Sequence, residues 1–301
     1  MKILKYLSII FFTVFVLSCE KHKLEYNAAP VDDSQVLLQL NYVVPATSIA
    51  GNYIIRVDLN NKPVSYANLV PFDLFPNSVG RFVTVKEGDV NIKLYKTVSG
   101  AQELVYDRNV NLPGGKRYNV FVYQFDKDPI VIDNGYPYVQ EPYPIRDSVC
   151  YFKFYNFYHD ADGITPLCKQ GEKLQLQYVY YTTTDCDAGW TVYAGTTDTF
   201  NLGEPIAFGE TTGWHPVRIR PTHKMSYGWN PLRIFVRLIK ADGTKVWLPY
   251  LNSAGVQTTY TWSTTTQRVL GRRYNLILCG RFGGSGGYSN QIWNFKEFNS
   301  L

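Results

Sequence analysis

The sequence predicts an all-β protein with two tandem β-sandwich domains. Apolar and polar residues alternate with period two in many segments, and no long segment has the helical period. Aromatic residues make up 16% of the chain, and both they and the threonine-rich runs favour strands. One eight-residue phrase occurs in both halves, which indicates two domains of related design.

The repeated phrase reads GKRYNVFV at Gly115–Val122 and GRRYNLIL at Gly271–Leu278. Each copy begins with a glycine, which can adopt the backbone conformation of a turn before a strand. An apolar opening strand stands well ahead of each copy, at Ser34–Tyr42 and Asp147–Phe157. Chance similarity is the alternative, because basic and aliphatic residues are common in strands.

Other strands are predicted from alternation and turn signals. The segments Val90–Leu94 and Leu232–Ile239 alternate, so each should bury one face, although the second face of Leu232–Ile239 is partly apolar too. The second runs into Ala241–Thr244 (ADGT) and then Val246–Leu248. Asp-Gly between two such runs predicts a hairpin with a type I′ turn, because glycine tolerates positive φ.

The predicted organisation has five parts. A linker is expected because four prolines fall within Asp126–Asp147. The parts are a signal peptide at 1–18, a lipidated tether at 19–34, an N-terminal β-sandwich at 35–128, a proline-rich linker at 129–146 and a C-terminal β-sandwich at 147–301.

The N-terminus predicts export and lipidation. Positive charges in Met1–Lys5 precede an apolar run of 13 residues, Tyr6–Ser18, which is shorter than the roughly 20 residues that span a bilayer. Val16–Cys19 resembles a bacterial lipobox, which implies that Cys19 is diacylated, with palmitate as a typical chain. The alternative is an ordinary signal peptide with an incidental cysteine. We expect an outer-membrane lipoprotein, and its membrane face stays open because Glu20–Lys23 departs from the acidic run of surface-exported lipoproteins.

The first half resembles a known kind of domain. Within Val83–Gln124, the matching parts are Gly88–Leu94, Leu104–Val110 and the Pro113–Gly115 turn that leads to Tyr118. They resemble an uncharacterised immunoglobulin-like or transthyretin-like sandwich domain of envelope lipoproteins from Bacteroidota. The second half matches only at its two ends. The resemblance implies an envelope lipoprotein without known chemistry.

No motif predicts catalysis, a cofactor or a metal site. The formal charge of +5 is too small to indicate nucleic-acid binding. The histidines form neither a zinc-protease motif nor part of a nucleophile elbow. His159–Gly163 (HDADG) has two carboxylates and a glycine, but a calcium loop needs further ligands, so a polar turn is favoured.

The second half contains four cysteines: Cys150, Cys168, Cys186 and Cys279. An oxidising envelope favours disulfides, and four cysteines allow three pairings. The spacing contains no close C-x-x-C pair of the kind that binds zinc. We predict a Cys168–Cys186 bridge, because these two residues end one candidate hairpin.

All six tryptophans also lie in the second half. Trp214, Tyr227 and Trp229 occur among glycines and prolines, which predicts surface loops and a ligand-binding site. The alternative is that these rings fill the core of a larger sandwich. Trp247 and Trp262 lie on strand-like runs and are expected in the core.

The predicted function is that of a non-catalytic, membrane-anchored lipoprotein that binds a glycan or an envelope protein. The alternative is a structural or anchor subunit of a surface fibre or envelope assembly. Glycan binding requires exposed aromatic rings, whereas a fibre subunit requires a long unpaired edge strand or a groove that lacks one.

Overall fold

The computed structural model contains only strands as regular elements within the part of the chain that it describes. In that part no helix has the length and apolar character needed to cross a membrane. The all-β prediction is therefore confirmed. The described residues are 31–46, 51–66, 68–76, 81–135, 149–183, 190–192, 199–218, 229–248, 250–251, 257–258, 263–269, 271–282 and 291–297.

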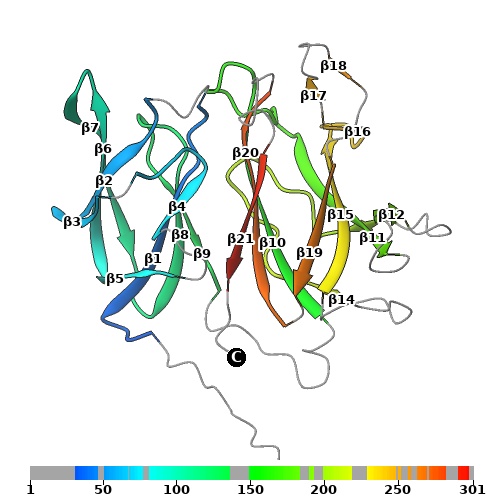
Figure 1. Ribbon diagram of the computed structural model, residues 1–301, viewed down its shortest axis with the longest axis horizontal. Helices are drawn as coiled ribbons and strands as arrows, with labels where there is room; N and C mark the ends of the chain where they lie inside the picture. Colours follow the sequence, from blue (N-terminus) through cyan, green and yellow to red (C-terminus); the bar gives the residue numbers. More distant parts are fainter. Residues whose placement is uncertain are drawn as a thin grey trace, which may run out of the picture. The chain divides into compact units, whose positions relative to one another are not determined.

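The N-terminal half forms two sheets (Figure 1). One has the order β4-β1-β8-β9, with β5 also paired to β1, and the other has the order β3-β2-β6-β7. β1 and β8 run parallel. The strands are β1 Gln35–Tyr42, β2 Ile54–Leu59, β3 Lys62–Ser65, β4 Asp73–Phe75, β5 Val83–Lys86, β6 Gly88–Val98, β7 Ala101–Leu112, β8 Lys116–Val122 and β9 Ile130–Asp133.

A hydrophobic core lies between these two sheets, because strands of both turn one apolar face inward. Val90, Ile92 and Leu94 of β6 are fully buried, as their alternation predicts. They belong to one cluster with residues of β1 and β8 in the other sheet, including Leu38 and Val120. Burial of this apolar area is the main stabilising contribution to the half.

The C-terminal half contains a four-stranded sheet, a six-stranded sheet and a two-stranded sheet (Figure 1). The first has the order β14-β10-β20-β21, and the second the order β12-β11-β15-β16, with β13 also on β11 and β19 also on β15; β17 pairs with β18 alone. The strands are β10 Val149–His159, β11 Lys173–Thr183, β12 Trp190–Val192, β13 Phe200–Asn201, β14 His215–Arg218, β15 Trp229–Ile239, β16 Lys245–Trp247, β17 Tyr250–Leu251, β18 Gln257–Thr258, β19 Ser263–Val269, β20 Arg273–Arg281 and β21 Gln291–Glu297.

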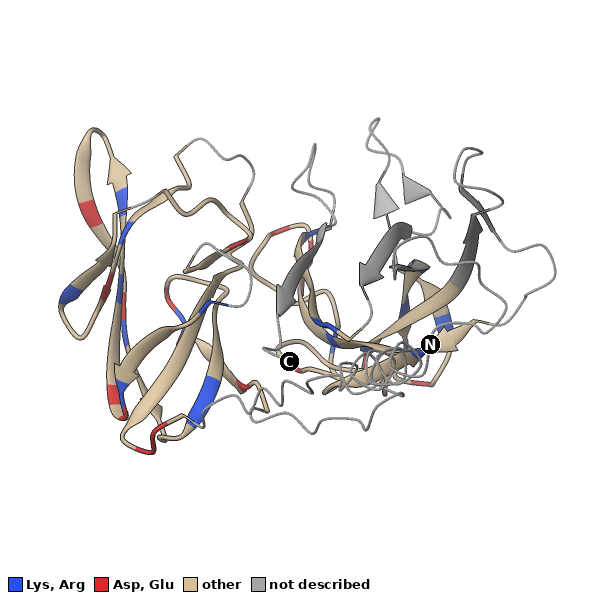
Figure 2. Cartoon of the chain, turned by 60° about the horizontal axis from the view of Figure 1, so that its bottom comes forward, with Lys and Arg blue, Asp and Glu red and all other residues tan. Residues whose placement is uncertain are grey.

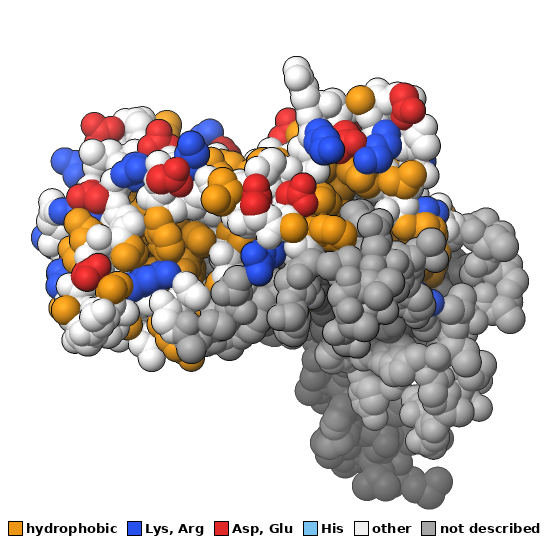
Figure 3. All heavy atoms as spheres, turned by 90° about the horizontal axis from the view of Figure 1, so that it is seen from above, with side chains coloured by type: hydrophobic (Ala, Val, Ile, Leu, Met, Phe, Trp, Pro, Cys, Tyr) orange, Lys and Arg blue, Asp and Glu red, His pale blue; other side chains and the backbone are white. Residues whose placement is uncertain are grey.

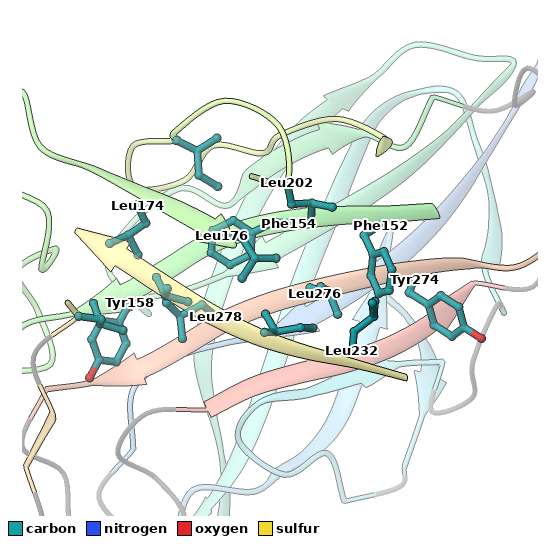
Figure 4. Close-up of a cluster of buried hydrophobic side chains, with 14 of the residues drawn as sticks. Phe152, Phe154, Tyr158, Leu174, Leu176, Leu202, Leu232, Tyr274, Leu276 and Leu278 are labelled. Carbon is teal, nitrogen blue, oxygen red and sulfur yellow. The ribbon is translucent and has the colours of Figure 1, made fainter. Parts of the chain in front are cut away.

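The C-terminal core also draws on both of its sheets. Figure 4 shows side chains from β10 and β20 facing those of β11 and β15. The predicted inward set on β15 is buried throughout, from Leu232 to Leu238. Aromatic rings contribute strongly, since Phe152, Phe154 and Tyr274 are all buried here. Large rings therefore fill part of the core of this half.

The repeated phrase has the same structure in both halves. Its copies form β8 and β20, and each lies parallel to the opening strand of its half, β1 or β10. Gly115 and Gly271 have φ values of 73° and 72°, a region in which glycine avoids the strain of other residues. Their amides donate to equivalent opening positions, the carbonyls of Gln35 and Val149.

The hairpin predicted at Ala241–Thr244 joins β15 to β16, but its turn type is wrong. Gly243 has φ 85°, whereas Asp242 is not among the described residues with positive φ, so the turn is not type I′. The Gly243 amide donates a hydrogen bond to the Lys240 carbonyl, and the Lys240 amide donates one to the Thr244 carbonyl. This is the longer hairpin loop, in which glycine alone takes the left-handed conformation.

The predicted linker begins too early. Ile130–Asp133 is strand β9, which pairs with β8 and so belongs to the N-terminal sheet. The apolar run Ile130–Ile132 carries this strand, and Pro129 stands just outside it. Residues 136–146, the last part of the expected linker, lie outside the described residues.

A third hydrophobic cluster contains residues from both halves. Phe121 of β8 stacks on Phe157 of β10, with ring centroids 4.3 Å apart, and both are fully buried. The two copies of the repeated phrase meet here. Asn119 Nδ2 donates to the hydroxyl of Tyr155 at 3.0 Å, and that hydroxyl donates to Asn275 Oδ1 at 3.1 Å. We call this contact region the joint.

Candidate functional site

The predicted loop site around Trp214, Tyr227 and Trp229 is not assembled within the described residues. Trp214 directly precedes β14 and is half-buried; its Nε1 donates to the Asn134 carbonyl at 2.8 Å. The Arg273 guanidinium lies 5.4 Å from the indole centroid. These contacts hold the ring against the protein, which favours a packing role.

The other two residues of that site have different outcomes. Tyr227 lies outside the described residues. Trp229 begins strand β15 and pairs with Val269, so the prediction of a loop at this position is wrong, and its side chain lies outside the description. Pro231 lies within the strand, opposite Gln267 of β19, while the pairing of β15 with β11 begins only at Leu232.

The C-terminal half exposes a different aromatic surface, on the outer face of β11, β15 and β16. Alternation on β15 turns Arg233, Phe235 and Arg237 away from the core. Trp247 of β16 lies opposite Arg237 in the ladder and is 38% exposed. We name the set Arg233, Phe235, Arg237, Trp247 and Gln177 the aromatic–arginine face.

Close contacts order this face. The Arg237 guanidinium carbon lies 3.0 Å from the centroid of the Trp247 ring, and Arg237 Nε donates to Gln177 Oε1 at 3.3 Å. The rings of Phe235 and Trp247 are 6.0 Å apart and tilted by 54°. Arg233 lies over Phe235 at 5.3 Å. The face therefore presents two cations, two rings and an amide together.

The prediction that Trp247 belongs to the core is wrong. Val246 packs against the C-terminal core and Leu248 is buried, so the residue between them points outward. The alternation of Lys245–Leu248 contained this signal. The apolar character of this run predicts a core position for Trp247, whereas its alternation predicts an outward one. Trp262 lies outside the described residues.

The face differs from the rest of the surface in its charge. Positive and negative residues are spread over strands of both halves (Figure 2) and mix with apolar side chains on the surface in Figure 3. On the outer face of β11, β15 and β16, the described outward positions include Lys173, Arg233, Arg237 and Lys245 and no carboxylate. Partial burial lowers the pKa of Arg237, although the guanidinium stays charged.

The HDADG segment forms a polar turn, as the sequence favours. The Asp162 carboxylate accepts hydrogen bonds from the Ile164 amide and from the amide and hydroxyl of Thr165. These bonds lower its pKa to about 2. The carboxylate is thus committed to the turn, and the described residues contain no cluster of three metal-ligating side chains.

The cysteines that the structure describes, Cys150, Cys168 and Cys279, form no disulfide with one another. Cys168 Sγ accepts a hydrogen bond from Asn156 Nδ2 at 3.6 Å. Burial raises the pKa of Cys168 to about 11, so its thiol stays protonated and unreactive. Cys186 lies outside the described residues, as does Cys19, so the Cys168–Cys186 bridge stays a prediction.

A buried histidine was not identified as special from the sequence. His159 ends β10 with no exposed surface, 4.9 Å from the ring of Phe208 and 6.3 Å from that of Tyr123. Burial lowers its pKa to about 4, and the nearby backbone of Gly280 and Phe157 partly offsets this. The imidazole is therefore neutral at pH 7.

Comparison with known proteins yields no family and a structural neighbour of low similarity. No family model matches the chain, and no curated protein matches it. Among solved structures, a leucine-rich repeat protein from Bacteroides thetaiotaomicron VPI-5482 is similar with 9% identity and a TM-score of 0.21. The match covers 83% of this chain and 27% of that protein, so the chain spans about a quarter of its length.

Proposed function

We propose that the chain is a non-catalytic, membrane-anchored envelope lipoprotein that binds a glycan through the aromatic–arginine face. The observation that carries this is the exposure of Trp247 beside Phe235. A large ring kept on a sheet face while both its chain neighbours pack inward contributes little to the core. Such a ring can stack on the apolar face of a sugar, and Gln177 can bond the hydroxyls.

The proposed architecture is two immunoglobulin-like sandwich domains behind a lipoprotein signal peptide. Its support is that each half has two sheets around one core and pairs its opening strand in parallel with the strand of the repeated phrase. This repeated arrangement is expected of two related domains. The proposed anchor rests on the sequence Val16–Cys19 alone.

Lipidation is tested by metabolic labelling of the full chain. Wild-type protein should incorporate radiolabelled palmitate, and Cys19→Ala should not, because the acyl chains attach to that sulfur. The Cys168→Ala variant is the control, since its buried thiol should not affect labelling. Retention of label in Cys19→Ala would refute the anchor.

Glycan binding is tested by affinity electrophoresis of the full chain through gels that contain neutral or acidic polysaccharides. Trp247→Ala should abolish the retardation and change the free energy of unfolding by about 1 kcal/mol or less, because the ring is partly exposed. Tyr95→Ala is the matched control, since Tyr95 also carries a stacked arginine but lies in the other half.

Two outcomes of that test would count against the proposal. Retardation that survives in Trp247→Ala would exclude this face as the binding site. Absence of retardation in every gel, with retention of an envelope protein on wild-type protein but not on the variant, would show instead that the face binds a protein.

A structural role in an envelope assembly is the second candidate, and strand β7 favours it. Ala101–Leu112 has 12 residues, pairs with β6 on one side and is the last strand of its sheet within the described residues. An open edge of this length can accept a strand from another chain. Charged residues such as Asp107 and Arg108 oppose such pairing. Concentration-dependent assembly that is lost in Val105→Pro would support this role.

A further inference from the structure

We propose that the aromatic–arginine face recognises an acidic saccharide, with the Arg237 guanidinium as its carboxylate-binding group. This inference rests on the glycan-binding function proposed above and adds the chemical class of the ligand. Its basis is the juxtaposition, on one sheet face, of a cation, an exposed indole and amide side chains. None of these groups is needed for the core, because the inward residues of β15 already fill it.

Charge is the first argument. The described outward positions of this face include four cations and no anion. The two carboxylates at its hairpin end are already engaged: Glu172 accepts from Lys240 Nζ at 2.9 Å, and Asp242 accepts from the Thr244 amide at 2.8 Å. The described outward side chains of this face are thus predominantly cationic, which favours a ligand with carboxylates.

The geometry of Arg237 is the second argument. Among the described residues, Arg237 makes no ion pair, and its hydrogen bond to Gln177 uses Nε. The Trp247 ring supports the flat side of the guanidinium. The Nη groups thus remain for a bidentate contact with a carboxylate, and the stacking and the bond to Gln177 hold the guanidinium in place.

The strands around Arg237 favour a saccharide over an acidic peptide. Strand β15 is paired with β11 on one side and with β16 and β19 on the other, and the last strand of this path, β16, has only three residues, so the face offers little open edge for a peptide to join. What remains for recognition is a surface of rings and amides. Phe235 and Trp247 offer the rings, while Gln177 and Asn201, which bond to each other at 2.8 Å, offer the amides.

The test compares polymers that differ only in charge. Full-length protein in detergent is titrated calorimetrically with polygalacturonate and alginate, and with the methyl-esterified form of each. We expect the acidic form of at least one polymer to bind about tenfold more tightly than its ester, as one charge-assisted contact would give. This preference should shrink as salt rises.

Arg237→Gln should remove that preference and leave weak binding of the ester unchanged. The matched control is Arg108→Gln, which removes one positive charge from a partly exposed residue in the other half. Equal binding of acid and ester by wild-type protein would overturn the acidic ligand and leave glycan binding intact. Failure of every polymer to bind would overturn both proposals. Binding of polyglutamate alone, lost in Arg237→Gln, would assign the face to an acidic protein.

Discussion

Two arginine–ring contacts, one in each half, differ in whether a carboxylate among the described residues lies beside the arginine. Arg56 lies 4.7 Å from the Tyr95 ring and donates two hydrogen bonds to Asp58, at 2.6 and 2.5 Å. Arg237 lies over Trp247 and bonds to Gln177 instead. The first arrangement is internally neutral, while the second has no carboxylate among the described residues.

The comparison shows that stacking of arginine on an aromatic ring does not by itself identify a binding site. What differs is how the charge is balanced. A buried carboxylate such as Asp58 must have a cation, so Arg56 stabilises the fold. Arg237 pairs with no such residue among those described, and this difference supports the ligand that we propose for it.

The largest effect is expected where the two halves meet. Phe157→Ala at the joint should lower the free energy of unfolding by about 3–5 kcal/mol, because it removes a fully buried ring that packs on Phe121. Urea denaturation measures the change, with the exposed Ile164→Ala as control. A loss below about 1 kcal/mol would mean that the halves are stable without this contact.

The next effect depends on pH and involves the same region. Because the pKa of His159 is about 4 in the folded protein and about 6.5 when unfolded, its contribution to stability is complete above pH 6.5. This contribution, about 3 kcal/mol to the free energy of unfolding, is lost as the pH falls to 4. His159→Phe should lack this part of the acid dependence in thermal unfolding followed between pH 7 and 4. An identical pH profile in the variant would contradict the assignment.

The smallest effect tests the two arginine pairs directly. Asp58→Ala should cost about 2 kcal/mol of stability, because it removes a buried carboxylate whose partner Arg56 is partly exposed and so screened. Arg237→Gln should cost no more than about 0.5 kcal/mol. Equal costs in urea denaturation would show that both arginines are structural and would remove the contrast between the halves.

The sequence predicts the strands of this fold better than their surroundings. Alternation identified the buried faces of β6 and β15, since a strand with one buried face has a strict period. The start of the linker is wrong because the prolines predict a linker, whereas the apolar run Ile130–Ile132 between them forms a strand. The turn type of the β15–β16 hairpin was missed because Asp-Gly suits more than one kind of loop.

The candidate site could be predicted only in part. The sequence shows that the second half is rich in tryptophan. The glycines and prolines near Trp214 and Trp229 predict the site there instead of at Trp247. The pairing of Trp247 with Arg237 depends on the register of the β15–β16 ladder, and the bond to Gln177 depends on β11, which lies far away in the chain. Contacts between strands that are distant in the chain can be predicted only when the pairing of the whole sheet is known.

The joint also has a consequence for the symmetry of the molecule. Asn119 and Asn275 occupy the same position in two copies of one phrase, yet they play different parts at the Tyr155 hydroxyl, which gives its single proton to only one of them. Tyr155 gives that proton to Asn275 and receives one from Asn119. Equivalent residues are thereby made unequal: one is the donor and the other the acceptor. The two copies of the phrase therefore differ in hydrogen-bonding role at the joint, although their sequences match at this position.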